Sequence, residues 1–268
     1  MDQKEVNWHL KKVGFFSSSK GAALMSASGK WILGNLTYLY EIQAQRNSGE
    51  PAPPIFAKTM EIGVENEPIA IAWARKNTDL NILHCDADFT EKLFLTTDYG
   101  FGASHDAFIG DFGRRIEWNE TLGSDELITF GGNVVALTKE LLEVKTLAGR
   151  DTANWMFSPT VPFEDKRRSV FEEHKWQMAG QLLLLPNVNK IRLLKYKPQI
   201  DSNPWDTVDV LDPSRGILFE YSRENFVTVS KDGVTNMIAE LEARVRYADA
   251  FLKSGLNIDR INELKIDY

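Results

Sequence analysis

Cysteine is almost absent from this chain of 268 residues, in which Cys85 is the only one. A single cysteine excludes an intrachain disulfide and any zinc site built from several cysteines, and it agrees with a reducing compartment. The histidines, at positions 9, 84, 105 and 174, form no pair at the spacing that zinc sites use. A phosphate-binding loop of the G-x-x-x-x-G-K-[ST] type is also missing, which argues against ATP-driven movement within this chain.

Long hydrophobic runs are missing too. No window approaches the roughly 18 apolar residues of a membrane-spanning helix, and the first residues, MDQKEVNWHLKK, lack the apolar segment of a secretory signal. We therefore expect no membrane association and a cytoplasmic location. The composition is 43% hydrophobic and 26% charged, with a net charge of -7, which is typical of a soluble globular protein. The acidic balance argues against a nucleic-acid coat protein but leaves room for a local basic track.

The chain contains no internal repeat, low-complexity tract or long linker, so we expect a single domain over residues 1–268. Apolar spacing predicts helices at 31–48, 57–76, 168–185 and 232–254. Short apolar or alternating runs predict strands at 81–85, 92–97, 101–109, 140–146, 190–197, 217–222 and 225–229. The polar stretch at about 111–138 has no clear period and is predicted to be an insertion. Helices around a central mixed β-sheet make an α/β or α+β fold.

The residues with the clearest chemical meaning surround Asp106 and Glu143. In the strand ELLEVKT, alternation places Glu143 and Lys145 on one face. If the strand that ends near Asp106 is its neighbour, the two carboxylates converge, and hard carboxylate oxygens suit Mg²⁺. Lys145 can then orient a water or stabilise charge on phosphorus. The alternative interpretation of an E-x-K triplet is a solvated strand face.

Several blocks occur in a fixed order along the chain: Trp8-His9, G-V-E-N-E-P-I-A at 63–70, S-H-D-A at 104–107, E-V-K at 143–145, and Gln177 on a helix before a strand. This order resembles the PD-(D/E)xK nuclease superfamily, and more closely its lambda-exonuclease branch of phage recombination nucleases. The resemblance spans roughly residues 7–198. It departs from the family where His105 replaces the usual proline and Ala107 the usual glycine.

The resemblance implies a restriction-endonuclease-like core and a metal centre. Asp106, Glu143 and the main-chain carbonyl of Val144 would ligate Mg²⁺, for which Mn²⁺ would substitute. Lys145 would hold the nucleophilic water.

Two further residues receive roles from the resemblance. Glu67 would face the site from a helix and reach the metals directly or through water, and Gln177 would brace the lysine or the water. On the residues alone, Glu67 can instead be a helix-capping acid and Gln177 an exposed helix glutamine. Pro68 predicts that the helix kinks or restarts after Glu67.

The N-terminal block indicates the kind of nuclease. Lys12 and Ser19 align with the arginine and serine that hold the 5′-phosphate in the lambda branch. Lysine keeps the charge of that arginine and loses its bidentate fork. The same stretch can be a serine-capped helix, and the two interpretations are compatible because helix N-termini bind phosphate. The cations of strand 190–197 are candidates for a phosphate track or ordinary solvated charges.

The resemblance implies a Mg²⁺-dependent 5′–3′ exodeoxyribonuclease that degrades the 5′-ended strand of linear double-stranded DNA for phage or prophage recombination in a bacterial cytoplasm. It further implies a ring-shaped homotrimer and a single-strand annealing protein as partner. One alternative is a structure-specific or restriction-like endonuclease on the same fold, which would not need the 5′-phosphate residues Lys12 and Ser19. A second alternative is a catalytically silent DNA-binding protein.

Overall fold

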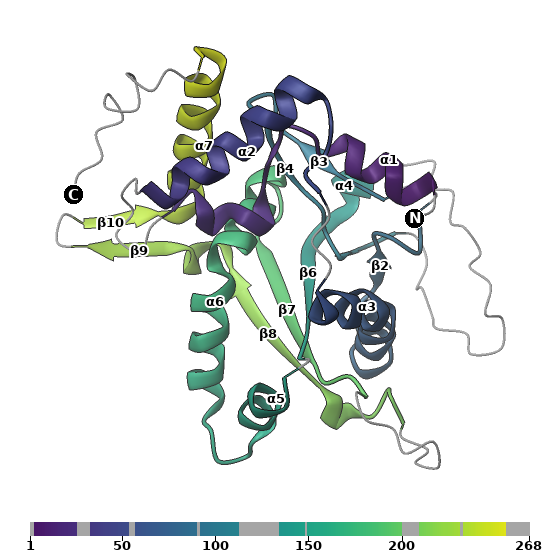
Figure 1. The fold of residues 1–268 in the computed structure, drawn as a ribbon. Coiled ribbons are helices and arrows are strands. Elements are labelled where there is room, and N and C mark those ends of the chain that lie inside the picture. Colours follow the sequence, from purple (N-terminus) through teal and green to yellow (C-terminus); the bar gives the residue numbers. More distant parts are fainter. Residues whose placement is uncertain are drawn as a thin grey trace.

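The structure, a computed structural model, describes residues 3–25, 33–53, 57–89, 92–112, 134–147, 149–199, 209–230 and 233–255 (Figure 1). The α-helices are α1 (Gln3–Lys11), α2 (Leu33–Ser48), α3 (Lys58–Asn77), α4 (Val134–Leu137), α5 (Arg150–Phe157), α6 (Phe163–Leu184) and α7 (Met237–Lys253). The strands are β1 (Phe16–Ser17), β2 (Ile82–His84), β3 (Leu95–Thr96), β4 (Phe101–Ala103), β5 (Ala107–Gly110), β6 (Thr138–Thr146), β7 (Lys190–Tyr196), β8 (Gly216–Ser222), β9 (Val227–Ser230) and β10 (Gly233–Asn236). Short 3₁₀ helices cover Ser18–Ala23, Pro213–Arg215 and Arg223–Asn225.

A five-stranded sheet forms the centre of the fold, in the order β2-β5-β6-β7-β8. Strands β6 and β7 are parallel, and the other neighbouring pairs are antiparallel. The predicted mixed α/β architecture is therefore confirmed. Because α5 and α6 connect β6 to β7, the chain returns to the starting end of the sheet and can continue parallel.

Helices α3 and α6 cover opposite faces of this sheet (Figure 1). On β6, Leu142 and Val144 join an apolar cluster that contains Trp73 of α3. Leu141 joins the other apolar cluster, which contains Val170 and other residues of α6. The alternation predicted for β6 is thus present, and it leaves the side chain of Glu143 on the α6 side.

A second, smaller sheet has the order β1-β4-β3, and its strand β4 directly precedes β5 of the central sheet in the sequence. The strand predicted over 101–109 is two strands, because β4 pairs with β1 and β3 whereas β5 pairs with β2 and β6. Residues 104–106 join the two sheets. The chain therefore leaves strand geometry at the segment that carries Asp106.

Helix α6 begins at Phe163 after Pro162. Two acidic side chains in its first turn stabilise the helix, because they lie at the positive end of the helix dipole. It starts earlier than the predicted range of 168–185. Helix α5 lies in a stretch between the predicted strand 140–146 and the predicted helix 168–185, where no helix was predicted. Helix α3 continues through Pro68 without restarting.

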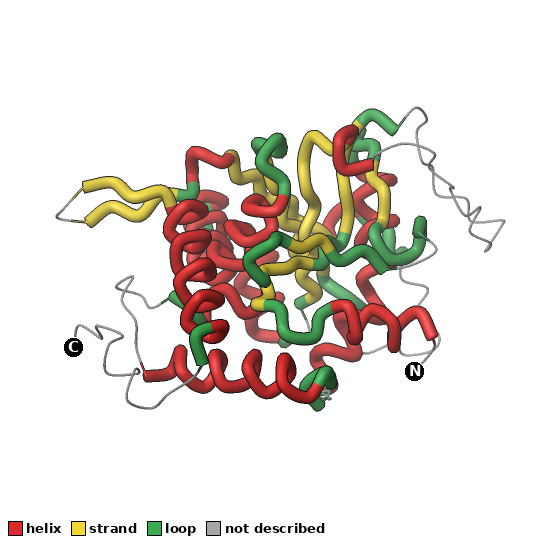
Figure 2. Tube along the Cα trace, turned by 90° about the horizontal axis from the view of Figure 1, so that it is seen from above, coloured by secondary structure: helices red, strands yellow, loops and turns green. Residues whose placement is uncertain are grey.

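The C-terminal region differs from its prediction. Residues 233–236, expected to be helical, form β10, which pairs antiparallel with β9, and the two strands project from the body in both views (Figure 1 and Figure 2). Helix α7 then begins at Met237, where the Asn236 side chain accepts hydrogen bonds from the main-chain N–H groups of Ile238 and Ala239. An ion pair between the partly exposed Arg46 and the buried Asp249, at 2.8 Å, joins α2 to α7.

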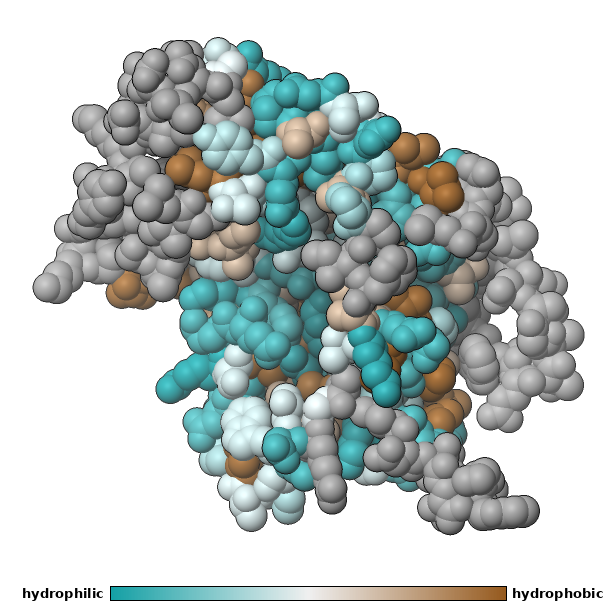
Figure 3. Space-filling model, viewed as in Figure 1, coloured by the Kyte–Doolittle hydropathy of each residue, from teal (hydrophilic) through white to brown (hydrophobic). Residues whose placement is uncertain are grey.

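Of the insertion predicted at 111–138, residues 113–133 lie outside the described part of the chain. Within the described ranges, none of the helices combines the length and apolar character needed to cross a membrane. The face drawn in Figure 3 is mostly hydrophilic, and its hydrophobic residues are scattered.

Candidate active site

The centre of the candidate site is Glu143 on β6, whose residue exposure is only 1%. Its carboxylate accepts a hydrogen bond from Gln177 Nε2 at 2.6 Å and another from Gln181 Nε2, both from α6. Lys145 Nζ lies 2.6 Å from Oε1 of the same carboxylate. A buried carboxylate is costly unless it is paired and hydrogen-bonded, and here three donors meet that requirement.

Asp106 lies beside this group, at the junction between the two sheets. Its Oδ2 accepts a hydrogen bond from the main-chain N–H of Val144 at 2.7 Å, and its carbonyl accepts one from Cys85 at 2.8 Å. Burial raises the pKa of Asp106 well above its ordinary range, and the negative charges of Glu143 and Glu67 raise it further. The two carboxylates predicted to converge are therefore close enough to repel each other.

Lys145 is held in its charged form. Burial alone lowers the pKa of a lysine, but the carboxylates of Glu143, Asp106 and Glu67 outweigh that effect and leave the pKa of Lys145 raised. A lysine in this state donates hydrogen bonds and positive charge, and it is unsuited to removing a proton.

Glu67 approaches from α3, on the other side of the sheet. Its Oε1 lies 3.1 Å from His84 Nε2 at the end of β2. The side chain of His84 is 4% exposed and that of Glu67 is 30% exposed. Glu67 is thus partly open to solvent while its charge reaches both Asp106 and Lys145.

These residues fit a divalent cation by their chemistry. Asp106, Glu143 and Glu67 supply hard carboxylate oxygens, and their mutual repulsion is the kind that a bound cation relieves. Across the described residues, however, no three His, Cys, Asp or Glu side chains are close enough together to form a metal site. The atoms of Glu143 are engaged by the two glutamines and the lysine, and Glu67 contacts His84.

Gln181 was missed in the sequence, although its i, i+4 spacing from Gln177 was the available signal. Gln181 is 1% exposed and also donates to the carbonyl of Ser104 at 3.4 Å. The main-chain carbonyl of Gln181 lies 3.5 Å from Nε2 of His105. Burial lowers the pKa of His105 to about 4, so this imidazole is neutral at pH 7.

The N-terminal block is joined to the same region through Trp8. The indole N–H of Trp8 donates to Ser104 Oγ at 3.1 Å, two residues before Asp106. Lys12 Nζ lies 3.8 Å from the centre of the Trp8 ring. Ser19 is exposed, and its hydroxyl contacts that of Ser17 at 2.7 Å, so the described contacts do not bring it directly onto Lys12.

The predicted helix at this position is a 3₁₀ helix, Ser18–Ala23, preceded by Ser17, whose side chain makes no capping bond. The cations of β7 are largely neutralised by neighbouring carboxylates. Arg192 contacts Glu140 at 2.6 Å and also Glu220, which agrees with ordinary ion pairs better than with a phosphate track.

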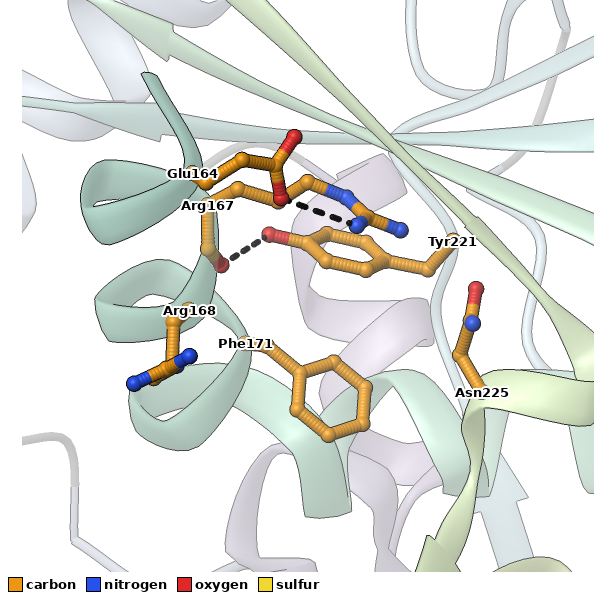
Figure 4. A pocket seen from close by; sticks show the side chains of 6 residues that line it. All are labelled: Glu164, Arg167, Arg168, Phe171, Tyr221 and Asn225. Carbon is orange, nitrogen blue, oxygen red and sulfur yellow. Dashed lines mark hydrogen bonds and ion pairs between the residues drawn. The ribbon is translucent and has the colours of Figure 1, made fainter. Parts of the chain in front are cut away.

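A separate hollow of about 270 Å³ lies between the first half of α6 and the end of β8 (Figure 4). Its lining residues are Glu164, Arg167, Arg168, Phe171, Tyr221 and Asn225. Arg167 is already engaged by Glu164 at 3.3 Å and by main-chain oxygen of Glu220. None of the carboxylates of the candidate site lines this hollow.

Comparisons with known proteins bear on the fold. Neither a protein-family model nor a curated protein matches the sequence. The crystal structure of the alkaline exonuclease LHK-Exo from Laribacter hongkongensis matches with a TM-score of 0.59 and 18% identity, over 96% of each chain. The fold is that of an alkaline exonuclease. The resemblance drawn from the ordered blocks is confirmed at this level.

Two further structures agree. LHK-Exo in complex with dAMP matches with a TM-score of 0.55 and 18% identity, over 97% of this chain and 98% of that one. A phage-related exonuclease from Haemophilus somnus 129PT matches with a TM-score of 0.52 and 14% identity, over 96% of this chain and 94% of that one. The likeness therefore extends over nearly the whole length of the chain.

Proposed function

We propose that this protein is a Mg²⁺-dependent deoxyribonuclease that degrades the 5′-ended strand of linear double-stranded DNA. The observation that carries the proposal is the convergence of Asp106, Glu143 and Lys145 at one point of an exonuclease fold. An inert DNA-binding protein has no need to hold two carboxylates where they repel each other. The residue roles below are part of the proposal, as is the assignment of the chain to a single nuclease domain.

Asp106, Glu143 and the carbonyl of Val144 would hold the cation, with Glu67 reaching it directly or through water. When bound, Mg²⁺ would offset the charge of the phosphodiester and activate a water. Lys145, held as an ammonium group, would orient that water and stabilise negative charge that develops on the phosphate oxygens.

Gln177 would keep Glu143 and Lys145 in place. Its amide donates to the same carboxylate oxygen that Lys145 contacts, which supports a positioning role over that of an exposed helix glutamine. Positioning of this kind is what transition-state stabilisation requires, because donors fixed in advance need no reorganisation during the reaction.

Lys12 and Ser19 would bind the 5′-phosphate at the end of the DNA. The contact of Trp8 with Ser104 supports this, because it ties the N-terminal block to the segment that carries Asp106. We extend the proposal to a ring-shaped homotrimer that threads DNA and to a single-strand annealing partner in phage recombination. That extension is based on the family resemblance.

Incubation with Mg²⁺ and linear duplex DNA, beside a closed circle of the same sequence, tests the proposal. Wild-type protein should degrade the linear DNA, spare the circle and lose activity in EDTA. Asp106→Ala and Glu143→Ala should each fall below a few per cent of wild-type turnover, because each removes a proposed ligand. Nicking of the circle as fast as digestion of the linear DNA would favour the restriction-like endonuclease instead.

A further inference from the structure

A second lysine, Lys92, lies close to Lys12 although 80 residues of chain separate them in the sequence. Lys92 Nζ is 5.2 Å from the centre of the Trp8 ring, and Lys12 Nζ is 3.8 Å from the same centre. Two ammonium groups therefore share one indole. Contacts of this type are favourable because the face of an aromatic ring carries partial negative charge.

Trp8 fixes where these two charges lie. Its indole N–H bonds to Ser104 Oγ at 3.1 Å, and Ser104 precedes Asp106 by two residues. The side chain of Lys92 is 23% exposed, so its ammonium group remains accessible to a ligand from solvent. The paired charges thus belong to the immediate surroundings of the candidate active site.

The neighbouring lysines differ in whether a carboxylate balances their charge. Lys92 contacts Asp86 at 2.9 Å, but no carboxylate of the described residues forms an ion pair with Lys12. Burial lowers the pKa of Lys12 to about 8, with the positive charges of Lys92 and Lys20 contributing to the shift. Lys20 itself is paired with Glu41 at 2.6 Å. An anion bound between two like positive charges relieves the repulsion between them.

We propose that Lys92 is the second cationic residue of the terminal-phosphate pocket and that, together with Lys12, it selects a 5′-phosphomonoester over other DNA ends. This inference rests on the proposed function. A phosphomonoester carries about -1.5 to -2 charges at pH 7, whereas an internal phosphodiester carries one. Two ammonium groups therefore complement the terminal phosphate better than they complement an internal one.

Lys92 also accounts for the lysine at position 12. Where the lambda branch has an arginine, Lys12 provides a point charge without the two parallel donors of a guanidinium group. A second ammonium group arriving from the segment before β3 restores a second donor direction toward the phosphate. The two lysines together would then supply the two donors that one arginine guanidinium provides.

The test measures the initial digestion rates of linear duplexes that differ only at the 5′ end: a phosphate, a methyl phosphate diester or a hydroxyl. Salt is held constant, because nonspecific phosphate affinity changes steeply with ionic strength. The variants are Lys12→Ala, Lys92→Ala and Lys92→Gln, the last of which removes the charge while keeping a side chain of similar length. Lys76→Ala is the matched control, because it removes one lysine from an exposed ion pair with Asp209 on the surface.

Wild-type protein should prefer the phosphate end over both the methyl ester and the hydroxyl. Both Lys92 variants should reduce the ratio of phosphate to hydroxyl rates by about tenfold or more, the scale of a lost charge-assisted hydrogen bond. They should reduce the ratio of methyl phosphate to hydroxyl rates less, because the methyl phosphate end carries only one negative charge. Lys76→Ala should leave every ratio unchanged.

A second measurement needs no catalysis. Metal-free calorimetry compares binding of the dinucleotides pTpT and TpT to wild type and to Lys92→Gln. Tighter binding of pTpT that is lost in Lys92→Gln supports the pocket, even if no nuclease activity is found and the proposed function fails.

Three results would overturn the inference. If wild type binds pTpT no more tightly than TpT and shows no end preference, the inference and the 5′-phosphate part of the proposed function fail together. If Lys12→Ala abolishes the preference while both Lys92 variants keep it, the inference alone fails. If Lys76→Ala lowers the preference as much as Lys92→Gln does, the effect is one of net charge and Lys92 has no specific role.

Discussion

Replacement of Asp106 by asparagine should abolish cleavage and stabilise the metal-free protein. The carboxylate of Asp106 accepts a hydrogen bond from Val144 N–H at 2.7 Å, and the amide oxygen of asparagine can accept the same bond. What the substitution removes is the charge, which burial and the carboxylates of Glu143 and Glu67 make unfavourable. We expect a gain of about 0.5–2 kcal/mol in the free energy of unfolding at neutral pH, the range of typical stabilising substitutions.

The effect should depend on pH in a defined direction. The folded-state pKa of Asp106 is raised, so folded wild-type protein holds this proton more tightly than the unfolded chain does. The corresponding stability is present at acid pH and is lost as pH rises through the folded pKa. The asparagine side chain cannot titrate, so Asp106→Asn should have little advantage in acid and its full advantage above the raised pKa.

Urea unfolding in EDTA at a series of pH values measures this difference, with equal m-values as the check that both proteins unfold alike. Addition of Mg²⁺ should reverse the order. A ligand at one hundred times its dissociation constant stabilises by about 2.7 kcal/mol, and only wild type should gain that amount. A variant that is less stable than wild type in EDTA at neutral pH, or a difference that does not change with pH, would refute the reasoning.

Three further predictions concern single side chains. Gln181→Leu should lower the free energy of unfolding by about 1.5–3 kcal/mol and reduce turnover, because it removes a donor to the buried Glu143; unchanged stability in urea would contradict this. Lys145→Ala should lose activity yet still bind Mg²⁺ or Mn²⁺ in a calorimetric titration, since a lysine is not a ligand, and failure to bind either metal would contradict its role. With Lys12 at a pKa of about 8, the preference for 5′-phosphate ends at subsaturating DNA should decline as pH rises through 8, and Lys12→Arg should remove the decline; an identical pH profile in the two proteins would exclude Lys12 as its source.

The sequence was sufficient to predict the faces of strand β6. A period of two along β6 determines that Glu143 and Lys145 share a face, and the structure has Leu142 and Val144 in the apolar cluster on the other face. The convergence of Asp106 with Glu143 was conditional on β5 and β6 being neighbours, and they are. Local periodicity predicts faces well because it depends only on the geometry of one strand.

Periodicity could not predict which distant segments of the chain contact one another. The strand predicted over 101–109 had to be divided between two sheets, which depends on the pairing of β4 with β1 and β3. The contact of Trp8 with Ser104 and the approach of Lys92 to Trp8 join segments that have no shared pattern in the sequence. Gln181 is different, because its spacing from Gln177 was visible and only its burial revealed its importance.

The C-terminal helix shows how pairing overrides helical spacing. Residues 233–236 continue the pattern of the following helix, but β10 pairs along its whole length with β9. Gly233, with a φ of 129°, adopts a backbone conformation that other residues rarely accept at the start of this strand. The helix can begin only where Asn236 caps it.

The most direct test of the central claim is a time course on linear duplex DNA in which the two strands carry different internal labels and only one 5′ end is phosphorylated, in the presence of Mg²⁺. We predict loss of label progressively from the 5′-phosphorylated end of one strand, release of mononucleotides, and an intact complementary strand. Loss from 3′ ends, equal loss from both strands, or internal fragments without mononucleotides would contradict the account.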